Sequence, residues 1–466
     1  MNRLSLAALA CLVGHSIALS LPFRPRTPGR YGTRDASDPF NFMNVNNQSG
    51  FDIYIATVSV EGHDFEESRK HNIFGRDVQL DTGSSDLWLD TTGVQLTTFQ
   101  DTGINQLVPY GDGSIAQGPI EIGNVTVGPY TVTQALISAP GTNATENGDK
   151  GLMGVGLPGI SQVSVALNAT NFQGKTVMEN IFAANPSLPP YFTVDLSRSE
   201  TMGSSSGGTF TIGETRSDLG AISNAPKLPV VNPTRWVTLL DGITVAGQSF
   251  APPITAFEFP GQLPTQLVTL LDTGGPLAVI PKMYLDAIYG NVPGAQFSTS
   301  LSAYTVPCDT AIDLSFVFGG ISYPIHPIDA VVGVVDPTQG GIVCFSGFVT
   351  AGNLGLDSSA DVLLGVSFLR NVYALFDFGN VVSGTDAPFI QLLATTDTST
   401  AAAEFQSLSA QRNASLMSLG SQPSPTSVAS GGSGAGAKSG ASRNVGVSIA
   451  LVTFAGVALG IGIILI

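Results

Sequence analysis

The chain has 466 residues, of which 43% are hydrophobic and 12% are charged, and its formal net charge is -16. This length allows two or three domains or lobes with a large buried core, and the normal apolar content excludes a chain that is disordered throughout. Only 19 Lys and Arg residues face 35 Asp and Glu residues, and no basic patch stands out, so binding to nucleic acid is not expected.

Residues 1–20 are typical of a secretory signal peptide. Arg3 provides a short basic start, an apolar run follows over 4–13, and Ala18 and Ser20 frame a cleavage site. The apolar run is too short to cross a bilayer. We therefore expect a secreted protein.

Residues 21–45 form a short basic segment between the signal peptide and the core. It contains Arg24, Arg26, Arg30 and Arg34, and no acidic residue precedes position 35. We predict that this segment is a short prosegment. It would be attracted to an acidic cleft of the protein at neutral pH and released when the carboxylates of the cleft lose their charge on acidification. A plain disordered linker is the alternative.

Residues 50–395 alternate short β-branched and aromatic runs with Gly, Asn, Asp and Pro, which is the pattern of antiparallel strands and turns. The pattern over 236–245 predicts a hairpin with its turn at Asp241 and Gly242. Helical periodicity is confined to short windows, at 176–184, at 283–289 and near Phe368. We therefore predict an all-β fold with a few short helices.

An internal repeat indicates two similar lobes. Residues 78–83 (Val-Gln-Leu-Asp-Thr-Gly) and 269–274 (Thr-Leu-Leu-Asp-Thr-Gly) are near copies, and their aspartates, Asp81 and Asp272, are 191 positions apart. A single Asp-Thr-Gly sequence is a common turn. Two copies at the spacing of a lobe are evidence for duplication.

Each copy of the repeat also has a downstream partner, made of two apolar residues and a glycine, at 152–154 and at 363–365. The repeated pair of features predicts an N-terminal lobe over 46–232 and a C-terminal lobe over 233–397.

The C-terminal part has the layout of a lipid-anchor signal. A Ser/Gly/Ala-rich linker is predicted over 398–434, and an apolar stretch over 445–466 has no basic cluster after it. Small residues, a polar spacer and an apolar tail together are typical of a GPI-attachment signal, predicted here over 435–466. A single tail-anchoring transmembrane helix is the alternative, because about 20 apolar residues suffice to span a bilayer.

Cysteines and sequons fit the same compartment. Cys11 lies in the predicted signal peptide, so Cys308 and Cys344 remain as the only intramolecular pair. We expect a disulfide between them, and two unpaired buried thiols are the alternative. Five Asn-x-Ser/Thr sequons are typical of a secreted glycoprotein, at Asn47, Asn124, Asn143, Asn168 and Asn413.

The motifs in the middle of the chain, taken together and in order, resemble those of the pepsin-like aspartic peptidases. Residues 81–88 (Asp-Thr-Gly-Ser-Ser-Asp-Leu-Trp) are very like the first active-site motif of that family, and 271–274 are similar to the second. Residues 110–114 (Tyr-Gly-Asp-Gly-Ser) are similar to the flap, a hairpin that closes over bound peptide. Further matches lie at 208–213, 304–308 and 368–377. With its signal peptide and tail, the chain resembles fungal secreted, GPI-anchored members of the yapsin and candidapepsin type.

The resemblance implies a bilobal fold of two similar β-barrel-like lobes, with a central active-site cleft and one catalytic aspartate from each lobe, Asp81 and Asp272. Two carboxyl groups in contact cannot both ionise cheaply, so one keeps a proton, as in pepsin. The charged member can take a proton from an attacking water while the protonated member donates to the scissile carbonyl oxygen. The resemblance therefore implies a monomeric endopeptidase that works at acidic pH on peptides and proteins, is inhibited by pepstatin-type compounds, and needs no cofactor or metal.

The same resemblance gives roles to the neighbouring residues. Thr82 and Thr273 bond the two loops to each other, Gly83 and Gly274 let the backbone approach the carboxyl groups, and Ser84 donates its hydroxyl to Asp81.

In the flap, the resemblance makes Trp88 a hydrogen-bond donor to Tyr110, with ordinary core packing as the alternative for Trp88. Gly111 and Asp112 follow Tyr110 in the flap. An acidic residue at Asp112 implies tolerance of Lys or Arg beside the cleaved bond, and a solvated turn aspartate is the alternative.

Two residues depart from the family pattern. The second Asp-Thr-Gly is followed by Gly275 where relatives usually have Ser or Thr, so Asp272 is expected to lack the hydroxyl partner of Asp81 and to hold the larger share of the proton. Val366 stands where an aspartate is common, and we expect a structural effect there.

Two other functions stay open on the sequence. The chain could be a catalytically silent relative that binds peptides or proteins at the cell surface, which Gly275 makes conceivable, or a surface adhesion or wall-structural glycoprotein. Both predict no peptide hydrolysis at acidic pH, whereas the peptidase predicts hydrolysis that depends on Asp81 and Asp272.

Overall fold

The computed structural model of the protein describes residues 40–46, 52–64, 72–110, 113–145, 149–198, 204–255, 257–336, 341–351, 360–379 and 386–420. All of them fall within one compact unit that contains Pro39–Ser421. The predicted signal peptide (1–20), most of the predicted prosegment (21–45) and the predicted GPI-attachment signal (435–466) lie outside these residues. Within the described part, no helix is both long enough and apolar enough to cross a membrane.

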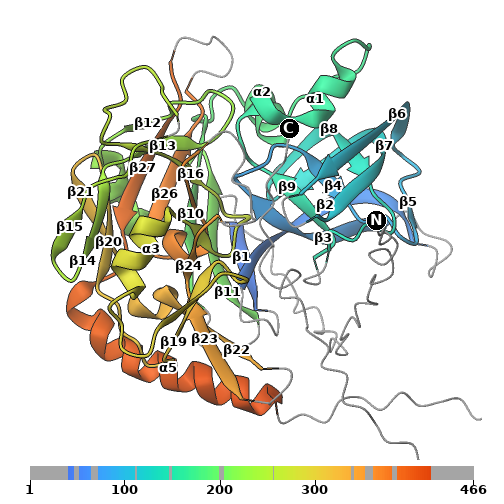
Figure 1. The fold of residues 1–466 in the computed structure, drawn as a ribbon. Coiled ribbons are helices and arrows are strands. Elements are labelled where there is room, and N and C mark those ends of the chain that lie inside the picture. The colour runs from blue at the N-terminus through green and yellow to red at the C-terminus, as the bar shows by residue number, and fades with distance from the viewer. Residues whose placement is uncertain are drawn as a thin grey trace, which may run out of the picture. The chain divides into compact units, whose positions relative to one another are not determined.

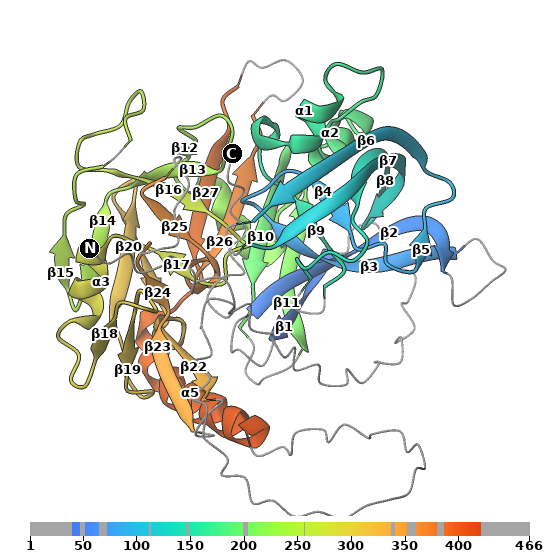
Figure 2. The same ribbon diagram turned by 45° about the vertical axis from the view of Figure 1, so that its right-hand side comes forward.

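A 14-stranded sheet dominates the described residues (Figures 1 and 2). Its neighbouring strands are, in spatial order, β12 (Leu228–Pro229), β27 (Phe389–Ala394), β26 (Val372–Asp377), β10 (Tyr191–Leu196), β11 (Ser204–Ile212), β1 (Phe40–Asn46), β2 (Asp52–Asp64), β3 (Asn72–Asp81), β9 (Gly151–Gly154), β4 (Leu87–Leu89), β8 (Tyr130–Ser138), β7 (Ile115–Val127) and β6 (Gln100–Pro109), with β5 (Val94–Gln95) on β2.

Three smaller sheets complete the C-terminal lobe. The first contains β13 (Val237–Leu240), β16 (Leu267–Leu271), β25 (Val362–Leu364), β17 (Ala278–Val279) and β24 (Phe348–Val349). The second contains β15 (Gln248–Phe250), β14 (Gly242–Val245), β20 (Leu314–Phe318) and β21 (Ile321–Ile325). The third contains β18 (Gln296–Ser298), β19 (Ala303–Val306), β23 (Ile342–Ser346) and β22 (Val331–Val335). The predicted all-β, bilobal fold is confirmed.

Helices are few and mostly short. They are α1 (Gln162–Leu167), α2 (Val177–Ala184), α3 (Lys282–Tyr289), α4 (Val366–Leu369) and α5 (Thr398–Gly420), with 3₁₀ turns η1 (Pro158–Ile160), η2 (Ser217–Asn224) and η3 (Pro327–Ala330). The three predicted windows are α2, α3 and α4. At the start of α2, Thr176 and Glu179 form a capping box, in which each side chain accepts the other residue's backbone N–H. The six residues of α1 are too few to show a helical period.

The hairpin predicted over 236–245 is wrong. β13 pairs with β16, whereas β14 pairs with β15 and β20, so the two segments belong to different sheets. The carboxylate of Asp241 accepts hydrogen bonds from Gln266 (2.7 Å) and from the backbone N–H of Gly320 (2.9 Å). Asp241 therefore lies where the chain passes from one sheet to another. Its hydrogen bonds with Gln266 and Gly320 stabilise this position, and no two-residue hairpin turn forms.

The two lobes share the large sheet. β10, from the N-terminal half, pairs antiparallel with β26, from the C-terminal half, over five residue pairs. Beneath this junction, aromatic rings pack together, with centroids 4.9 Å apart for Phe192 and Phe376 and 5.3 Å apart for Trp236 and Phe376. The indole N–H of Trp236 donates to the carbonyl oxygen of Val155 (3.0 Å). Burial of such large side chains makes the junction rigid.

The N-terminal boundary of the first lobe is earlier than predicted. β1 begins at Phe40, within the segment 21–45 that we assigned to a prosegment or linker. It pairs with both β2 and β11, so these residues are part of the large sheet. The alternation of Phe40 and Phe42 with Asn residues is a period-2 signal that the basic composition of the preceding residues obscured.

The C-terminal boundary is later than predicted, because α5 occupies 398–420, where we expected the first part of a Ser/Gly/Ala-rich linker. The helix packs on β22 and η3 and buries Ala401, Phe405 and Leu416. Arg412 donates to the backbone carbonyl oxygens of Val331 (2.5 Å) and Cys308 (3.0 Å). The segment 398–420 consists largely of small and polar residues, which is why its sequence resembles a linker. It forms a helix because it packs against the C-terminal lobe.

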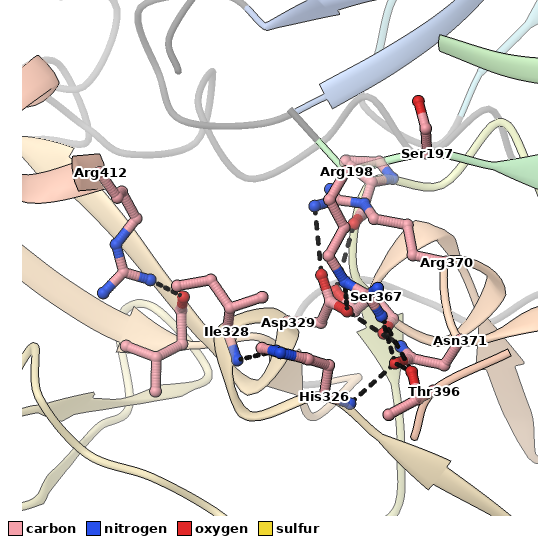
Figure 3. A network of polar contacts seen from close by, with 12 residues as sticks. Ser197, Arg198, His326, Ile328, Asp329, Ser367, Arg370, Asn371, Thr396 and Arg412 are labelled. Atoms are coloured by element: carbon pink, nitrogen blue, oxygen red, sulfur yellow. Dashed lines mark hydrogen bonds and ion pairs between the residues drawn. The ribbon is translucent and has the colours of Figure 1, made fainter. Parts of the chain in front are cut away.

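A polar network joins the segment just before α5 to the rest of the unit (Figure 3). The buried carboxylate of Asp329 accepts from Nε of Arg198, which follows β10 (2.8 Å), and from Asn371 Nδ2 (3.0 Å). Thr396, just before α5, donates to Asn371 Oδ1 (2.6 Å) and accepts from Arg198 Nη2 (3.1 Å). The network therefore ties both halves of the chain to the segment that leads into α5.

Candidate active site

The two Asp-Thr-Gly sequences end equivalent strands. β3 runs parallel to β9, with Asp81 opposite Gly154, and β16 runs parallel to β25, with Leu271 opposite Leu364. The downstream apolar-apolar-Gly elements of the sequence repeat are therefore the strands that flank each aspartate. Both Asp81 and Asp272 are 0% exposed.

The two threonines hold the loops together in a symmetric way. The backbone N–H of Thr82 donates to Thr273 Oγ1 (3.0 Å), and the backbone N–H of Thr273 donates to Thr82 Oγ1 (2.9 Å). Each hydroxyl in turn donates across the junction, Thr82 to the carbonyl of Leu271 and Thr273 to the carbonyl of Leu80, both at 2.7 Å. Four buried hydrogen bonds therefore fix one loop against the other.

The glycines bring each loop against the opposite carboxyl group. A Cβ atom added to Gly83 would lie 2.7 Å from both carboxyl oxygens of Asp272. A Cβ atom added to Gly274 would lie 2.6 Å from Asp81 Oδ1 and 3.1 Å from Asp272 Oδ1. No side chain fits in either place, so only glycine lets the two carboxyl groups meet.

The donors to the two carboxyl groups differ. Asp81 Oδ1 accepts from the backbone N–H of Gly83 (2.7 Å) and Asp81 Oδ2 accepts from the hydroxyl of Ser84 (2.5 Å). Asp272 Oδ1 accepts from the backbone N–H of Gly274 (2.8 Å), whereas its Oδ2 is buried and receives no N–H or hydroxyl donor from the described residues. The missing donor is the one that Gly275 cannot supply.

This asymmetry decides where the proton lies. Burial raises the pKa of Asp272 well above its ordinary value, and the negative charge of Asp81 raises it further. Burial also raises the pKa of Asp81, but the hydrogen bonds from Asp272 and Ser84 act in the opposite direction. The geometry thus favours a protonated Asp272 that donates to a charged Asp81, in agreement with the expectation drawn from Gly275.

Val366, the second departure from the family pattern, lies beside the second loop. Its backbone N–H donates to the carbonyl of Gly275 (2.7 Å), and its side chain is buried at the start of α4. An apolar side chain suits this site because it packs in the core, and the structural effect expected of the substitution stays a prediction.

The flap residues that the structure describes lie next to the first motif. Trp88, on β4, donates its indole N–H to the hydroxyl of Tyr110, which follows β6, and their ring centroids are 6.2 Å apart. The backbone N–H of Tyr110 donates to Ser114 (2.9 Å), which closes the hairpin between β6 and β7. Gly111 and Asp112 lie outside the described residues.

One buried cation near the dyad was not predicted. Arg235 is 5% exposed, and its Nη1 donates to the carbonyl of Gly83 (3.2 Å). Its positive charge lowers the pKa of both Asp81 and Asp272. The sequence does show that Arg235 is one of only 19 Lys and Arg residues and that it lies next to an apolar strand. Neither fact indicates which part of the fold its side chain contacts.

Other predicted sites lie away from the dyad. Cys308 and Cys344 form the expected disulfide, with the sulfur atoms 2.05 Å apart. Among the sequons, Asn124, Asn143 and Asn168 are exposed, Asn413 is half-buried on α5, and Asn47 lies outside the described residues. No group of His, Cys, Asp or Glu side chains suited to a metal ion occurs in the described ranges.

Comparison with known proteins agrees with this architecture. The family model "eukaryotic aspartyl protease" matches residues 72–386. The chain belongs to the eukaryotic aspartyl protease family. It is therefore an aspartic-type endopeptidase of the pepsin-like class, and the family implies peptide substrates and inhibition by pepstatin-type compounds.

Three fungal relatives illustrate the degree of similarity. An aspartic protease of Phaffia rhodozyma is 25% identical over 331 residues, which cover 66% of this chain and 72% of the relative. Endothiapepsin of Cryphonectria parasitica is 28% identical over 315 residues, covering 63% and 68%. Rhizopuspepsin of Rhizopus chinensis is 28% identical over 322 residues, covering 65% and 72%. The family match ends at residue 386, so α5, which begins at Thr398, lies outside the matched region.

Proposed function

We propose that this aspartic peptidase hydrolyses peptide bonds with Asp81 as the general base and Asp272 as the general acid. The observation that carries this assignment is the uneven supply of donors: Asp81 accepts from Ser84 and Gly83, whereas the buried Asp272 Oδ2 receives no N–H or hydroxyl donor from the described residues. A charged Asp81 and a protonated Asp272 follow from it.

The chemical step then proceeds without a covalent intermediate. Asp81 takes a proton from a water molecule as the water oxygen attacks the scissile carbonyl carbon, and Asp272 gives its proton to the carbonyl oxygen. In the second half, Asp81 returns its proton to the leaving nitrogen, the C–N bond breaks, and Asp272 regains a proton from the intermediate. The threonine hydrogen bonds keep the two carboxyl groups positioned throughout.

Acidic working pH is part of the proposal. The reaction needs one proton on the dyad, and that proton is lost as the pH rises through the higher of the two pKa values of the pair. Digestion of a peptide library at a series of pH values, with and without a statine-type inhibitor, tests it. Hydrolysis confined to acidic pH and abolished by the inhibitor is expected. A protein that binds the inhibitor but cleaves nothing would instead be the catalytically silent relative.

We further propose a monomeric, secreted enzyme of the yapsin and candidapepsin type that is held at the cell surface, at the plasma membrane or in the wall, by a GPI anchor. The support is the signal-like segment 1–20 and the small residues ahead of the apolar stretch 445–466. Treating intact cells with a phosphatidylinositol-specific phospholipase should release the activity into the medium. Retention after this treatment, with extraction by detergent, would favour a transmembrane helix.

A further inference from the structure

Arg235 projects from a rigid part of the protein. It precedes Trp236, whose indole N–H is bonded to the carbonyl of Val155 (3.0 Å) and whose ring packs on Phe376. The backbone N–H of Arg235 donates to the carbonyl of Asn232 (3.3 Å). The position of the guanidinium group is therefore set by the packed junction between the lobes.

The guanidinium group acts on Gly83, a residue that contacts both carboxyl groups. Gly83 donates its N–H to Asp81 Oδ1 (2.7 Å), and its Cα faces both oxygens of Asp272 so closely that a Cβ would lie 2.7 Å from them. Arg235 Nη1 donates to the carbonyl of this same glycine (3.2 Å). A shift of the Gly83 peptide would change the distance between the carboxyl groups, and Arg235 opposes that shift.

Arg235 also brings a permanent charge. The guanidinium group of an arginine carries a positive charge in proteins. The active dyad holds one negative charge in a fully buried site, where such a charge is costly unless an opposite charge compensates it. The positive charge of Arg235 lowers the pKa of both aspartates, against the effect of burial.

We propose that Arg235 is a positioning residue of the dyad, which holds the Gly83 peptide between the two carboxyl groups and places a compensating positive charge beside them. This inference rests on the proposed function of Asp81 and Asp272 in hydrolysis. Its consequence is that the singly charged dyad persists to lower pH than burial alone would allow. The charge of Arg235 thereby lowers the pKa of Asp272, which partly replaces the effect of the hydroxyl donor that Asp272 lacks.

Two substitutions separate the charge from the hydrogen bond. Arg235→Gln keeps a donor for the carbonyl of Gly83 and removes the charge, whereas Arg235→Lys keeps the charge and loses the planar fork. The pH profile of kcat/KM is measured on a peptide without titratable side chains. For Arg235→Gln we expect both the acidic and the alkaline limb of this pH profile to move to higher pH by about one unit, because the pKa values of both aspartates rise when the positive charge is removed. For Arg235→Lys we expect limbs close to those of the wild type, with a lower plateau.

Arg216→Met is the matched control, because it also removes one positive charge, and this side chain forms ion pairs with Asp195 and Asp218. Its profile should coincide with that of the wild type. A uniform loss of kcat/KM in Arg235→Gln, with both limbs in place, would show a purely structural role and overturn the proposal. A shift of the same size in Arg216→Met would overturn it as well.

The proposed function is tested separately by the wild type. If the wild type hydrolyses no peptide at any pH, the proposed function fails, and the pH dependence of binding of a statine-type inhibitor, measured by calorimetry, then tests Arg235 without turnover. The same upward shift is expected for Arg235→Gln. Identical binding profiles for wild type and variant would contradict the role of Arg235.

Discussion

The loop around Asp81 and the loop around Asp272 share one backbone framework and differ in the residue that follows each Asp-Thr-Gly. Both end a strand that is paired in parallel, both use a threonine to bond the other loop, and both present a glycine to the opposite carboxyl group. Ser84 then donates to Asp81, while the equivalent position after the second loop is Gly275. The duplicated framework brings the carboxyl groups together, and the one missing hydroxyl makes them unequal.

The largest effect should come from removing either carboxylate. Asp81→Asn takes away the proposed base and Asp272→Asn takes away the proposed acid, so each variant should lose about 10³-fold or more in kcat. The measurement is hydrolysis of a peptide substrate at the optimum pH of the wild type. If one of the two variants kept most of its activity, the proposed sharing of roles between the loops would be wrong.

The glycines test whether the loops must touch. In Gly83→Ala and Gly274→Ala, the new methyl group would overlap the opposite carboxyl group at 2.6–2.7 Å, so the dyad must move apart. We expect kcat to fall by about 10²-fold, because a displacement of about 1 Å is enough for that. Gly220→Ala is the matched control, since nothing lies within 4 Å of the added atom. Equal activity in all three variants would contradict the close contact.

Exchanging the donors should move the pH profile in opposite directions. Gly275→Ser offers a hydroxyl to the second loop. Its Cβ would lie 3.1 Å from the end of the Leu363 side chain and at ordinary contact distance from the carbonyl oxygens of Leu277 (3.5 Å) and Asp272 (3.7 Å). A donor to Asp272 favours the charged form and lowers its pKa, so the alkaline limb of kcat/KM should move to lower pH. Ser84→Ala removes the donor to Asp81 and should move the limbs to higher pH. Shifts of about half a unit are expected.

The double variant Ser84→Ala/Gly275→Ser completes this test, since it reverses the asymmetry between the loops. Its profile should lie between those of the single variants. If Gly275→Ser left both limbs unchanged, the missing hydroxyl would not be the cause of the raised pKa of Asp272.

The smallest effect concerns stability. The pKa of Asp272 in the folded state lies well above its ordinary value, so the folded protein binds more protons than the unfolded chain over the range between these two values. The free energy of unfolding therefore falls as pH rises through that range. Asp272→Asn should flatten this dependence, measured as Tm against pH, more than Asp81→Asn does. Equal slopes in the two variants would show that the proton is not localised on Asp272.

Local patterns predicted the parts of the site that each loop makes by itself. The repeat around Asp81 and Asp272, with its two threonines, identified the loops, because a strand that ends in Asp-Thr-Gly builds its turn from neighbouring residues. Cys308 and Cys344 were found because only one pairing was possible. The absence of a hydroxyl at Gly275 was readable for the same reason.

Three features that depend on partners far along the chain were not predicted. Arg235 reaches Gly83 across 152 positions, and no periodicity or spacing encodes that contact. The segment 236–245 has the pattern of a hairpin, yet its two strands join different sheets because other strands pair with them. α5 has a composition typical of a linker and is a helix because it packs on β22 and η3.

By itself the sequence determined the family, the two lobes and the identity of the paired aspartates, because those depend on duplicated segments whose chemistry is local. Gly275 already indicated an inequality of the two carboxyl groups, but only the tertiary structure decided the environment of these two groups. Their pKa values depend on burial, on the hydrogen-bond donors that reach each oxygen and on the charge of Arg235, and these quantities exist only once the lobes have packed together.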